Sequence, residues 1–538
     1  MFLSGWREQA WQRLHDPLDV LVVGGGITGA GILHDAALRG LGVALVERGD
    51  FGCGTSSRSS KLIHGGLRYL KRMQLGITRT ACRERDLLAL ASPHLVAMLR
   101  FLYPSYAQDT TPGWQVDLGL SMYDHLTPAR HHHERVNAET AARLVPALAR
   151  PGLEFGLLYD DAVADDARLV MAVVSAGVLA GGVALSYATL EEFLRDRQGR
   201  VCGAVVRDLE SGATARVTAR VVVNATGVWC DQLRALSGET RGRLRPSRGS
   251  HLLFARNRLP LDLGVTALSP DDGRPVFAVP HPEGTLVGTT DLFHDGPLEE
   301  PRPSGEELAY LLRFAQHCFP GMHLGPGDIC GAFSGVRPVL SSHAEHPSEA
   351  SREEAVWEER GLVSTAGGKL TTFRATAEKA MATVIRALPE ERREALLPAR
   401  SAMVTLPWRA DPSAVAAALA NLKVDRAVID GLVRRLGALA LPAALGAPPD
   451  ALRPLGDGLD LCGGELAFQA RCGGVVHLED LLLRRVRLGM WQPRRCLELA
   501  PRLRPLLRRA VGWSVKRWNT ELERLDRAVA NWLPPEAP

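Results

Sequence analysis

Three glycines near the start of the chain have the spacing of a dinucleotide-binding turn. Gly24, Gly26 and Gly29 form a GxGxxG pattern directly after the apolar residues 19–23. Such a turn lets backbone N–H groups approach a pyrophosphate at the positive end of the following helix. Glu47 ends the next apolar run, 43–47, where its carboxylate can accept hydrogen bonds from the adenosine ribose hydroxyls. The pattern predicts a dinucleotide cofactor; the alternative is a glycine-rich turn that binds nothing.

The following stretch, GCGTSSRSSKLIHGGLRYL at 52–70, favours FAD over a nicotinamide. It places hydroxyl and glycine residues beside Arg58, His64 and Arg68, a composition suited to an extended passage lined by phosphate and flavin. A plain NAD domain does not need this passage, and the sequence has no second glycine fingerprint for a nicotinamide. The alternative is that the serines only form turns. We predict that the cofactor contacts in this stretch are Thr55, Ser56, Ser57, Lys61, Leu62 and Gly65.

Residues 365–374, TAGGKLTTFR, predict a second cofactor contact at a helix that begins at Gly368. Backbone donors and the helix dipole there could stabilise negative charge on a reduced flavin. Lys369 would oppose the positive helix end, so we expect it to face an anion, either the flavin or the substrate. The alternative is a solvated surface lysine. The predicted cofactor contacts are Gly367, Gly368, Lys369, Leu370 and Thr371.

Arg337 precedes Pro338 and follows an apolar run, which predicts that its side chain leaves an extended segment. A guanidinium is suited to bidentate recognition of phosphate or carboxylate, although a surface or ion-paired arginine would have the same local sequence. The histidine tract 131–133 has no clustered cysteine or acidic partners, so we expect a solvated loop there and no metal site.

The elements around these residues predict one sheet assembled from distant parts of the chain. Residues 19–47 read as a parallel βαβ unit, residues 166–190 as a helix followed by a strand, and residues 217–225 and 361–365 as further buried strands. We therefore expect an FAD-dependent oxidoreductase domain over 1–398. Its FAD lobe would comprise approximately 16–75, 160–235 and 325–398, and its substrate lobe approximately 76–159 and 236–324. The Ala-, Leu- and Arg-rich residues 399–538 predict a mainly helical domain.

Composition is that of a soluble globular protein, with 46% hydrophobic and 23% charged residues. A net charge of +4 gives no reason to expect nucleic acid. Nine cysteines without a CxxC pair argue against disulfides and structural zinc, and a reducing cytoplasm fits best. The first residues read as an amphipathic helix and not as a secretory signal, and no apolar run is long enough to span a bilayer.

Several motifs in one order carry a family resemblance. They are GGGITGAGILHDAALRGLGVALVE, TSSRSSKLIHGGLRYL, MYDHL, DDARLV, NATGVW, SGVRPVL and GGKLTTFR, followed more faintly by LGMW at 488–491. Together they resemble the FAD-dependent, respiratory-type sn-glycerol-3-phosphate dehydrogenases. The resemblance implies an α/β fold that is like D-amino-acid oxidase. Its parts are a Rossmann-like βαβ core that binds FAD and a substrate lobe with an antiparallel sheet, and the helical C-terminal domain follows.

The resemblance also implies an activity and its residues. Hydride would pass from C2 of glycerol 3-phosphate to flavin N5, and electrons would leave to a membrane quinone. Arg68 and Tyr69 match the family's HGGLRY stretch, and His251 matches its GSH motif. Arg337 and Lys369 match the arginine of GVRP and the lysine of GGKLT, so these five residues are expected to bind the substrate. Arg337 and Lys369 are also expected to be catalytic, since they would bind the substrate phosphate or polarise its hydroxyl. The motif NATGVW adds the cofactor contacts Ala225, Thr226 and Gly227.

His251 and His64 are both candidates for accepting the proton of the C2 hydroxyl, because imidazole titrates near working pH. No cysteine or histidine lies in a recognisable flavin-attachment motif, so we expect FAD without a covalent bond, although His64 is near enough in sequence to require a test.

Two alternatives to this function remain. One is a related flavin oxidase that uses oxygen or acts on a carboxylate; a carboxylate would need one arginine, whereas Arg68, Arg337 and Lys369 together suit a dianionic phosphate. The other is an FAD-binding regulatory protein at the membrane surface without turnover.

A quinone acceptor would require contact with lipid from the surface. We expect a cytoplasmic protein attached peripherally to the inner face of the membrane, and a homodimer is an open alternative to a monomer. The N-terminal helix with Trp6 and Trp11 is one candidate contact. The other is a basic C-terminal tail facing anionic lipid; the alternative is that its arginines solvate packed helices or pair with Glu498, Glu521 and Glu523. Its basic residues are Arg484, Arg485, Arg487, Arg494, Arg495, Arg502, Arg504, Arg508, Arg509, Lys516 and Arg517, interleaved with Leu506, Leu507, Trp513 and Trp518.

Overall fold

The glycine fingerprint joins the central strand of a mainly parallel sheet to a helix. In the computed structural model, which describes residues 2–66, 75–126, 132–341 and 354–534, β1 (Leu18–Val23) lies between β2 (Val43–Glu47) and β10 (Thr214–Asn224), parallel to both. The first sheet has the order β17-β18-β10-β1-β2-β7. Its remaining strands are β7 (Val183–Ser186), β17 (Ala355–Glu359) and β18 (Leu362–Ala366), and β8 (Ala188–Arg195) and β9 (Val201–Asp208) extend β10 as an antiparallel ribbon.

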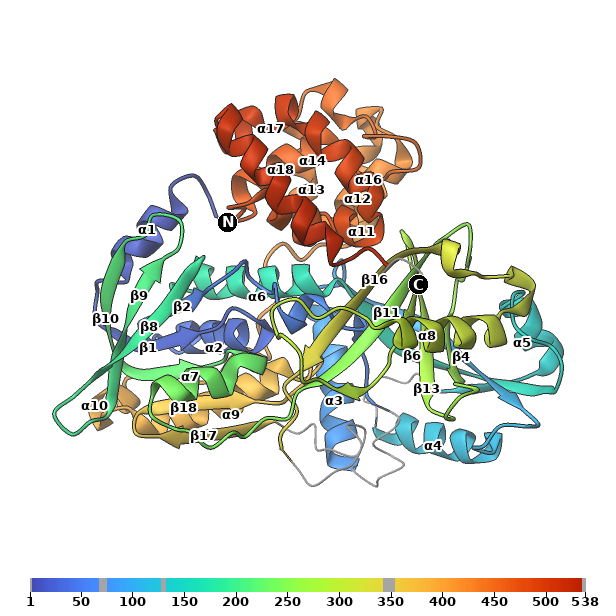
Figure 1. Cartoon of the computed structure of the whole chain (residues 1–538), viewed down its shortest axis with the longest axis horizontal. Helices are drawn as coiled ribbons and strands as arrows, with labels where there is room; N and C mark the ends of the chain where they lie inside the picture. Colours follow the sequence, from blue (N-terminus) through green and yellow to red (C-terminus); the bar gives the residue numbers. More distant parts are fainter. Residues whose placement is uncertain (1, 67–74, 127–131, 342–353, 535–538) are drawn as a thin grey trace.

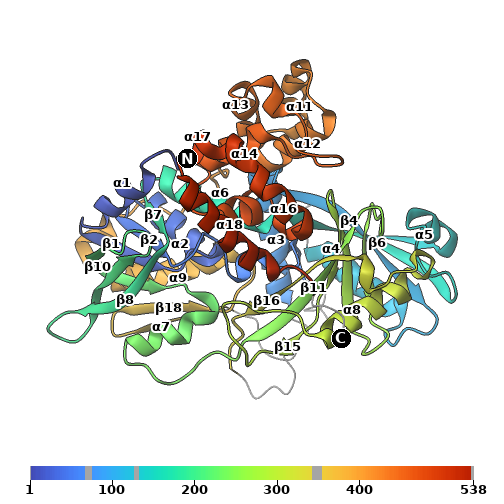
Figure 2. The same cartoon turned by 45° about the horizontal axis from the view of Figure 1, so that its top comes forward.

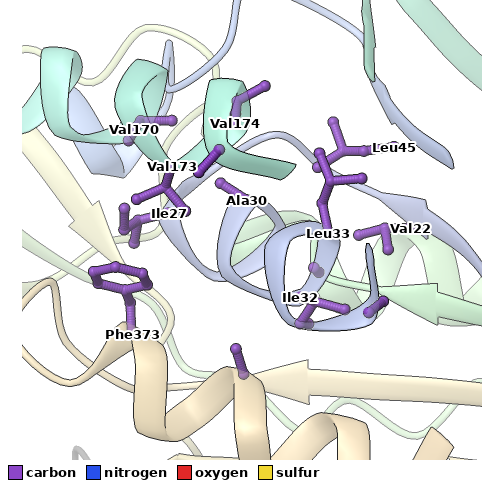
Figure 3. Close-up of a cluster of buried hydrophobic side chains, with 14 of the residues drawn as sticks. Val22, Ile27, Ala30, Ile32, Leu33, Leu45, Val170, Val173, Val174 and Phe373 are labelled. Atoms are coloured by element: carbon purple, nitrogen blue, oxygen red, sulfur yellow. The ribbon is translucent and has the colours of Figure 1, made fainter. Parts of the chain in front are cut away.

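Both faces of the first sheet are covered, which explains its continuous apolar strands. Helices α2 (Ile27–Leu38), α6 (Asp166–Leu179) and α9 (Phe373–Ala387) pack on one face. Figure 3 shows α2 between the other two, with Ala30, Val173 and Phe373 pointing into the shared core. The β8–β9–β10 ribbon and the expected N-terminal helix, α1 (Trp6–Arg13), cover the other face. Side chains of Trp6 and Trp11 pack partly against this core.

The second sheet is mainly antiparallel and has the order β15-β11-β14-β13-β12-β4-β6-β3, with β16 paired to β11 and β5 to β6. One of its faces packs on α8 (Gly305–Cys318) and α5 (Ala138–Leu144). Its strands are β3 (Leu62–Ile63), β4 (Val96–Tyr106), β5 (Glu134–Asn137), β6 (Leu153–Ala164), β11 (Ser247–Ala255), β12 (Gly264–Leu268), β13 (Pro275–His281), β14 (Gly284–Gly288), β15 (Leu292–Phe293) and β16 (Ile329–Arg337). Helix α4 (Gly113–Leu126) packs on the other face through Leu120, and α3 (Leu75–Ala91) packs on α4 through Cys82.

The pairing of β11 with β16 defines what we call the site face of the second sheet. In register, Ser247 is opposite Arg337, Gly249 opposite Gly335, and His251 opposite Phe333. Because side chains alternate along a strand, these six residues share one face. The intervening residues, including Leu252 and Ala332, point to the opposite face and into the core beneath α8.

Two segments expected in the FAD lobe lie in the second sheet instead. They are β3 and β16, which the sequence boundaries placed in 16–75 and 325–398. Both precede or follow segments of the first sheet in the sequence, and an apolar strand has the same local pattern in either sheet. The chain passes from β16 of the second sheet to β17 of the first through residues 342–353, which lie outside the described residues.

The expected helical domain follows (Figures 1 and 2), where it covers α6 and the first residues of β16. A helix with i→i+5 hydrogen bonds, Asp480–Arg485, lies where the domain contacts the first sheet's lobe. The α-helices of the domain are α11 (Pro412–Leu419), α12 (Arg426–Leu436), α13 (Ala440–Leu445), α14 (Gly463–Cys472), α15 (Leu488–Trp491), α16 (Pro493–Leu499), α17 (Arg504–Val511) and α18 (Val515–Ala530), and α10 (Glu390–Glu394) precedes it. Among the helices that the structure describes, none has the length and apolar content to cross a bilayer.

Candidate active site

Two of the fingerprint glycines are required by close packing of the protein itself. A Cβ on Gly29 would lie 1.9 Å from the carbonyl oxygen of Gly24, and a Cβ on Gly24 would lie 2.6 Å from that of Ala225. Gly24 also has a φ of +109°, which disfavours any side chain. Gly26 differs, because a Cβ there would meet only the hydroxyl of Ser56 at 3.2 Å. The protein therefore leaves the space at Gly26 open, as close approach of a pyrophosphate requires.

Glu47 is fixed beside this loop by two backbone donors. Its Oε2 accepts a hydrogen bond from the N–H of Gly25 at 2.6 Å, and its Oε1 accepts one from Gly49 at 2.8 Å. Burial raises the pKa of Glu47, and the two N–H groups oppose the rise. Each carboxylate oxygen can accept a further bond, so this position fits the ribose hydroxyls of a dinucleotide.

Hydroxyls of the serine-rich segment hold neighbouring elements together. Ser56 Oγ accepts from the N–H of Ile27 at 3.0 Å, and Thr55 Oγ1 donates to the carbonyl of Val336 at 2.5 Å, which links the segment to α2 and to β16. Ser57 Oγ donates to the carbonyl of Gly54 at 3.5 Å. The predicted contact Leu62 is buried in β3.

Lys61 is also buried, and its Nζ donates to the two carboxylate oxygens of Asp166 at 2.9 and 3.0 Å. The Lys61 ammonium is therefore committed to an ion pair, and a cofactor contact by this residue would have to use its backbone.

A three-residue network supports Gly65. The N–H of Gly65 donates to Tyr123 Oη at 2.9 Å and to Asp161 Oδ1 at 3.2 Å, and Arg85 donates to the same two oxygens. A Cβ on Gly65 would lie 2.2 Å from the Tyr123 hydroxyl. Sequence reasoning missed Arg85, Tyr123 and Asp161, although Tyr123 lies within the MYDHL motif of the family resemblance.

Strand ends of the first sheet bring the other predicted cofactor residues to the glycine loop. Ala225 and Thr226 follow β10 directly, and Thr226 Oγ1 donates to Asn224 Oδ1 at 2.7 Å. Gly227 begins a 3₁₀ turn with a φ of +59°. The carboxyl ends of parallel strands are the edge at which α/β sheets bind ligands.

The helix expected from Gly368 begins at Phe373 instead. Gly367 and Gly368 have φ values of +76° and +77°, and two successive left-handed residues cannot belong to a right-handed helix. Lys369 and Leu370 therefore lie in the loop before α9 and not in its first turn. Thr371 Oγ1 accepts from the N–H of His64 at 3.1 Å, so this loop contacts the chain just after β3. His64 and the Lys369 loop are thereby neighbours.

Arg337 lies over Gly249 on the site face. Its Nη1 donates to Asp291 Oδ1 at 3.0 Å and its Nη2 to Thr289 Oγ1 at 3.2 Å. A Cβ on Gly249 would lie 2.1 Å from that Nη2, so only glycine leaves room for the guanidinium. The Arg337 side chain is 22% exposed, whereas that of Asp291 is 1% exposed. Sequence reasoning missed Asp291 and Thr289, although GTTD follows the β14 strand.

His251 is buried two positions from Gly249. Its ring stacks on Phe333 with centroids 4.7 Å apart, and its Nε2 lies 2.8 Å from Ser60 Oγ. Burial lowers the pKa of His251 well below its ordinary value, and Arg337 and Lys61 lower it further. The imidazole is therefore neutral at physiological pH. Its Nδ1 has no hydrogen-bond partner within the described part of the chain.

The structure thus brings Arg337 and His251 together on one face and sets His64 beside the loop of Lys369. Arg68 and Tyr69 lie outside the described residues. His131 of the histidine tract is also outside them, and His133 lies between Asp117 and Asp124, each at 2.7 Å. No group of three potential metal ligands occurs among the residues that the structure describes.

Comparisons with known proteins agree with this arrangement. A family model described as "FAD dependent oxidoreductase" matches residues 19–348, and one described as "C-terminal domain of alpha-glycerophosphate oxidase" matches residues 405–518. Glycerol-3-phosphate dehydrogenase 2 of Mycobacterium tuberculosis is 36% identical over 550 residues, which cover 98% of this chain and 89% of the relative. The aerobic glycerol-3-phosphate dehydrogenase of Bacillus subtilis is 37% identical over 377 residues, 69% of this chain and 68% of the relative.

Among solved structures, the glycerol-3-phosphate dehydrogenase from Bacillus halodurans, complexed with FAD, has a TM-score of 0.81 to this chain at 26% identity, and the match covers 100% of both chains. These findings confirm the expected fold, which is like D-amino-acid oxidase with an added helical domain, and they confirm FAD as the cofactor. By its sequence over nearly its whole length, the chain belongs to the FAD-dependent glycerol-3-phosphate dehydrogenases.

Proposed function

We propose that this enzyme oxidises sn-glycerol 3-phosphate to dihydroxyacetone phosphate and passes the electrons to a membrane quinone. The observation that carries the proposal is an oriented guanidinium, Arg337, beside a neutral imidazole, His251, on one face. FAD, held by the glycine fingerprint and the residues around it, would supply the two-electron acceptor for the hydride that leaves substrate C2. The names of the relatives support the same substrate.

A dianionic phosphate needs more than one cationic group. Arg337 is held in orientation by Asp291 and Thr289, and a planar guanidinium can bind phosphate through two parallel N–H bonds. We assign Lys369 as the second cation, since its loop contacts the chain at His64. Arg68 is the third cation in this proposal, from its motif alone.

Oxidation at C2 also requires an acceptor for the hydroxyl proton. We assign this role to His251, with His64 as the alternative. His251 is neutral and its Nε2 is placed by Ser60, so the ring can take up a proton. A bound dianion beside the ring would raise the pKa of His251 from its lowered value, which makes the ring a better base only when substrate is present.

Anaerobic titration of the purified flavoprotein tests the substrate. We expect glycerol 3-phosphate to bleach the visible absorbance of the flavin, and glycine and lactate to leave it unchanged. Bleaching by a carboxylate compound and not by glycerol 3-phosphate would replace this proposal with the amino- or hydroxy-acid oxidase alternative. If none of the compounds bleached the flavin, the protein would be an FAD-binding protein without turnover.

The acceptor is tested separately by steady-state turnover with a soluble quinone and with dissolved oxygen. We expect the quinone to support turnover and oxygen to support little. Turnover with oxygen that equals turnover with quinone would favour the oxidase alternative.

Membrane attachment remains part of the proposal, with a smaller basic surface than the sequence predicted. Arg484, Arg485 and Arg487 are buried in ion pairs and cannot face lipid. Trp518 is buried too. The basic residues of this region that stay exposed are Arg494, Arg502, Arg508, Arg509 and Lys516. Basic residues at an anionic surface contribute about 1 kcal/mol each, so this set suffices for reversible binding at the inner face of the membrane.

Sedimentation with vesicles tests the surface. We expect binding to anionic vesicles that weakens as salt rises, and less binding by an Arg508→Gln/Arg509→Gln variant. The matched control is Arg197→Gln/Arg216→Gln, which neutralises two exposed arginines near the β8–β9–β10 ribbon. Equal loss in both variants, or no loss in either, would move the attachment site away from α17.

A further inference from the structure

Two neighbouring arginines of the C-terminal domain bind one buried aspartate of the lobe that holds the glycine fingerprint. Arg485 Nη1 and Nη2 donate to the two carboxylate oxygens of Asp50, at 2.7 and 2.8 Å. Arg484 Nε donates to the same carboxylate, and its Nη2 donates to Asp480 Oδ1 at 2.6 Å. All four side chains are buried. The contact joins residues more than four hundred positions apart in the sequence.

Asp50 belongs to a segment that touches the glycine fingerprint directly. Two residues later, the N–H of Gly52 donates to the carbonyl of Gly25 at 2.9 Å. Ser56 Oγ caps the N–H of Ile27 at the start of α2, and the ring of Phe51 lies 2.9 Å from where a Cβ of Gly25 would be. Residues 48–61 thus form one wall of the loop that must receive the pyrophosphate. We call residues 48–61 the cofactor segment.

A third arginine of the same domain fixes the far end of the cofactor segment. Arg487 Nη2 donates to Asp166 Oδ1 at 2.9 Å, and Asp166 also accepts from Lys61 Nζ and from Ser59 Oγ at 2.8 Å. Arg487 Nη2 lies 3.4 Å from the carbonyl of Ser57 as well. Guanidinium groups of the C-terminal domain therefore hold both ends of the segment.

The cofactor segment has little regular structure with which to keep its own shape. Between β2 and β3 it contains only the 3₁₀ turn Thr55–Ser57, so its contacts with other parts of the chain must define its conformation. Because the charges are buried, the arginine contacts strongly determine the conformation of the cofactor segment. Burial alone would raise the pKa of Asp50, yet Arg485 and Arg484 hold it below its ordinary value. Removing one member of a buried ion pair leaves an uncompensated charge, which is much more costly than losing a surface pair.

We propose that the C-terminal domain is a positioning element for FAD: Arg484 and Arg485, through Asp50, and Arg487, through Asp166, hold the cofactor segment in the shape that binds the dinucleotide. Affinity for FAD then depends on residues that do not touch it. The domain adds no catalytic group in this role.

The same domain contains a matched contact that does not involve the cofactor segment. Arg434 Nη1 donates to Glu283 Oε1 in the second sheet at 2.7 Å, and Arg434 also pairs with Asp460. Arg434 and Arg485 thus each join the C-terminal domain to the rest of the chain through a buried or half-buried carboxylate. Of these two arginines, only Arg485 pairs with a residue of the cofactor segment, which contacts the glycine fingerprint.

The experiment compares Arg485→Gln with Arg434→Gln in the full chain. FAD is removed, and its return is measured by quenching of free flavin fluorescence, together with the rate at which the reconstituted protein releases FAD. We expect at least a tenfold rise in the FAD dissociation constant for Arg485→Gln and less than a twofold change for Arg434→Gln. Amide hydrogen exchange in residues 50–58 should rise only in Arg485→Gln.

An equal change in FAD affinity in the two variants, or no change in either, would overturn the proposal and leave these contacts a purely structural role. If Arg485→Gln does not fold, Arg485→Lys replaces it, because it keeps the positive charge while it loses the two-pronged bond to Asp50 and the guanidinium's bonds to the carbonyls of Gly473 and Gly474. An intermediate loss of FAD affinity in Arg485→Lys would support the proposal, and wild-type affinity in that folded variant would overturn it.

Discussion

The glycine fingerprint and the site face are built by opposite means. The fingerprint is a contiguous turn, and it works through atoms that are absent: side chains on Gly24 or Gly29 would collide with backbone. The site face is assembled from β11 and β16, more than seventy residues apart, and it works through side chains that are present, above all Arg337 and His251. A contiguous turn depends on local backbone geometry, whereas the site face depends on strand register. The two regions should therefore fail differently when altered.

The largest expected effect comes from the fingerprint itself. Gly29→Ala should destabilise the protein and abolish FAD binding, because its Cβ would lie 1.9 Å from a backbone oxygen. Gly26→Ala should also weaken the affinity for FAD by at least a hundredfold, or about 2.7 kcal/mol. The thermal unfolding temperature of its apoprotein should stay near that of the wild-type apoprotein. Flavin content and unfolding of the apoprotein check both variants. Retention of FAD by Gly26→Ala would contradict the placement of the pyrophosphate at this turn.

On the site face, Arg337→Gln should lower kcat/KM for glycerol 3-phosphate by two to three orders of magnitude, roughly 3–4 kcal/mol, with FAD content unchanged. The kcat/KM of Arg337→Lys should lie between those of the wild type and Arg337→Gln. A lysine keeps the positive charge but loses the planar guanidinium that can form two parallel hydrogen bonds. The control is Arg248→Gln on the same β11 strand, whose side chain pairs with Glu307 away from the site face. Arg248→Gln should affect stability and leave kcat/KM near wild type. If both variants lost activity equally, the two faces of the sheet would not be functionally distinct.

The same contrast explains how much the sequence predicted. The βαβ unit was predicted at the correct position, and 43–47 matches β2. Its strands, turn and helix are consecutive in the sequence, and strands and helices differ in the spacing of their apolar residues. The assignments of β3 and β16 were wrong, since nothing local in an apolar strand tells which sheet it joins. Asp291 and Ser60 were missed for a similar reason: their partners, Arg337 and His251, lie 46 and 191 positions away in the sequence, and only the folded chain brings them close.

Buried arginines of the C-terminal domain were the hardest residues to predict. Arg484, Arg485 and Arg487 read as part of a basic surface, because their partners Asp50 and Asp166 are hundreds of positions away. Charged residues are mostly exposed, so a cluster of arginines predicts a surface unless an acidic partner is visible nearby. The start of α9 was misplaced by a local error instead, since consecutive glycines can open a helix or precede it.

A smaller effect should follow from the hydrogen bond that holds His251. Ser60→Ala removes the partner of Nε2 and leaves the ring stacked on Phe333. Losing one hydrogen bond of this kind costs about 1 kcal/mol, so kcat should fall roughly fivefold with KM unchanged. Ser59→Ala, assayed with saturating FAD, is the matched control, because its hydroxyl bonds to Asp166 and not to His251. A change in KM alone would assign Ser60 to substrate binding instead of ring placement.

The last expected effect concerns stability in mild acid, which compares one buried histidine from each region. His34 lies in α2 behind the fingerprint and His251 lies on the site face. Burial lowers the pKa of His34 to about 4 and that of His251 well below its ordinary value. In the unfolded chain both titrate near 6.5, so below that pH the unfolded state binds protons that the folded state does not. The contribution of these two histidines to the free energy of unfolding should therefore be constant above pH 6.5 and fall as pH drops from 6.5 toward 4.

Each histidine can contribute a loss of at most about 2 kcal/mol between pH 6.5 and 5, at roughly 1.4 kcal/mol per pH unit. Carboxylates with lowered pKa values, such as those of Asp50 and Asp166, lose their contribution only at lower pH, so they do not obscure this window. We expect His34→Gln and His251→Gln each to reduce the acid loss of stability, measured by urea unfolding of the holoprotein at pH 7 and pH 5. If the acid loss of stability were reduced in His34→Gln but not in His251→Gln, then His251 would be protonated in the folded state at pH 5. The imidazole on the site face would then be a stronger base than its burial implies, and more than half of it would be protonated below pH 5 even without substrate.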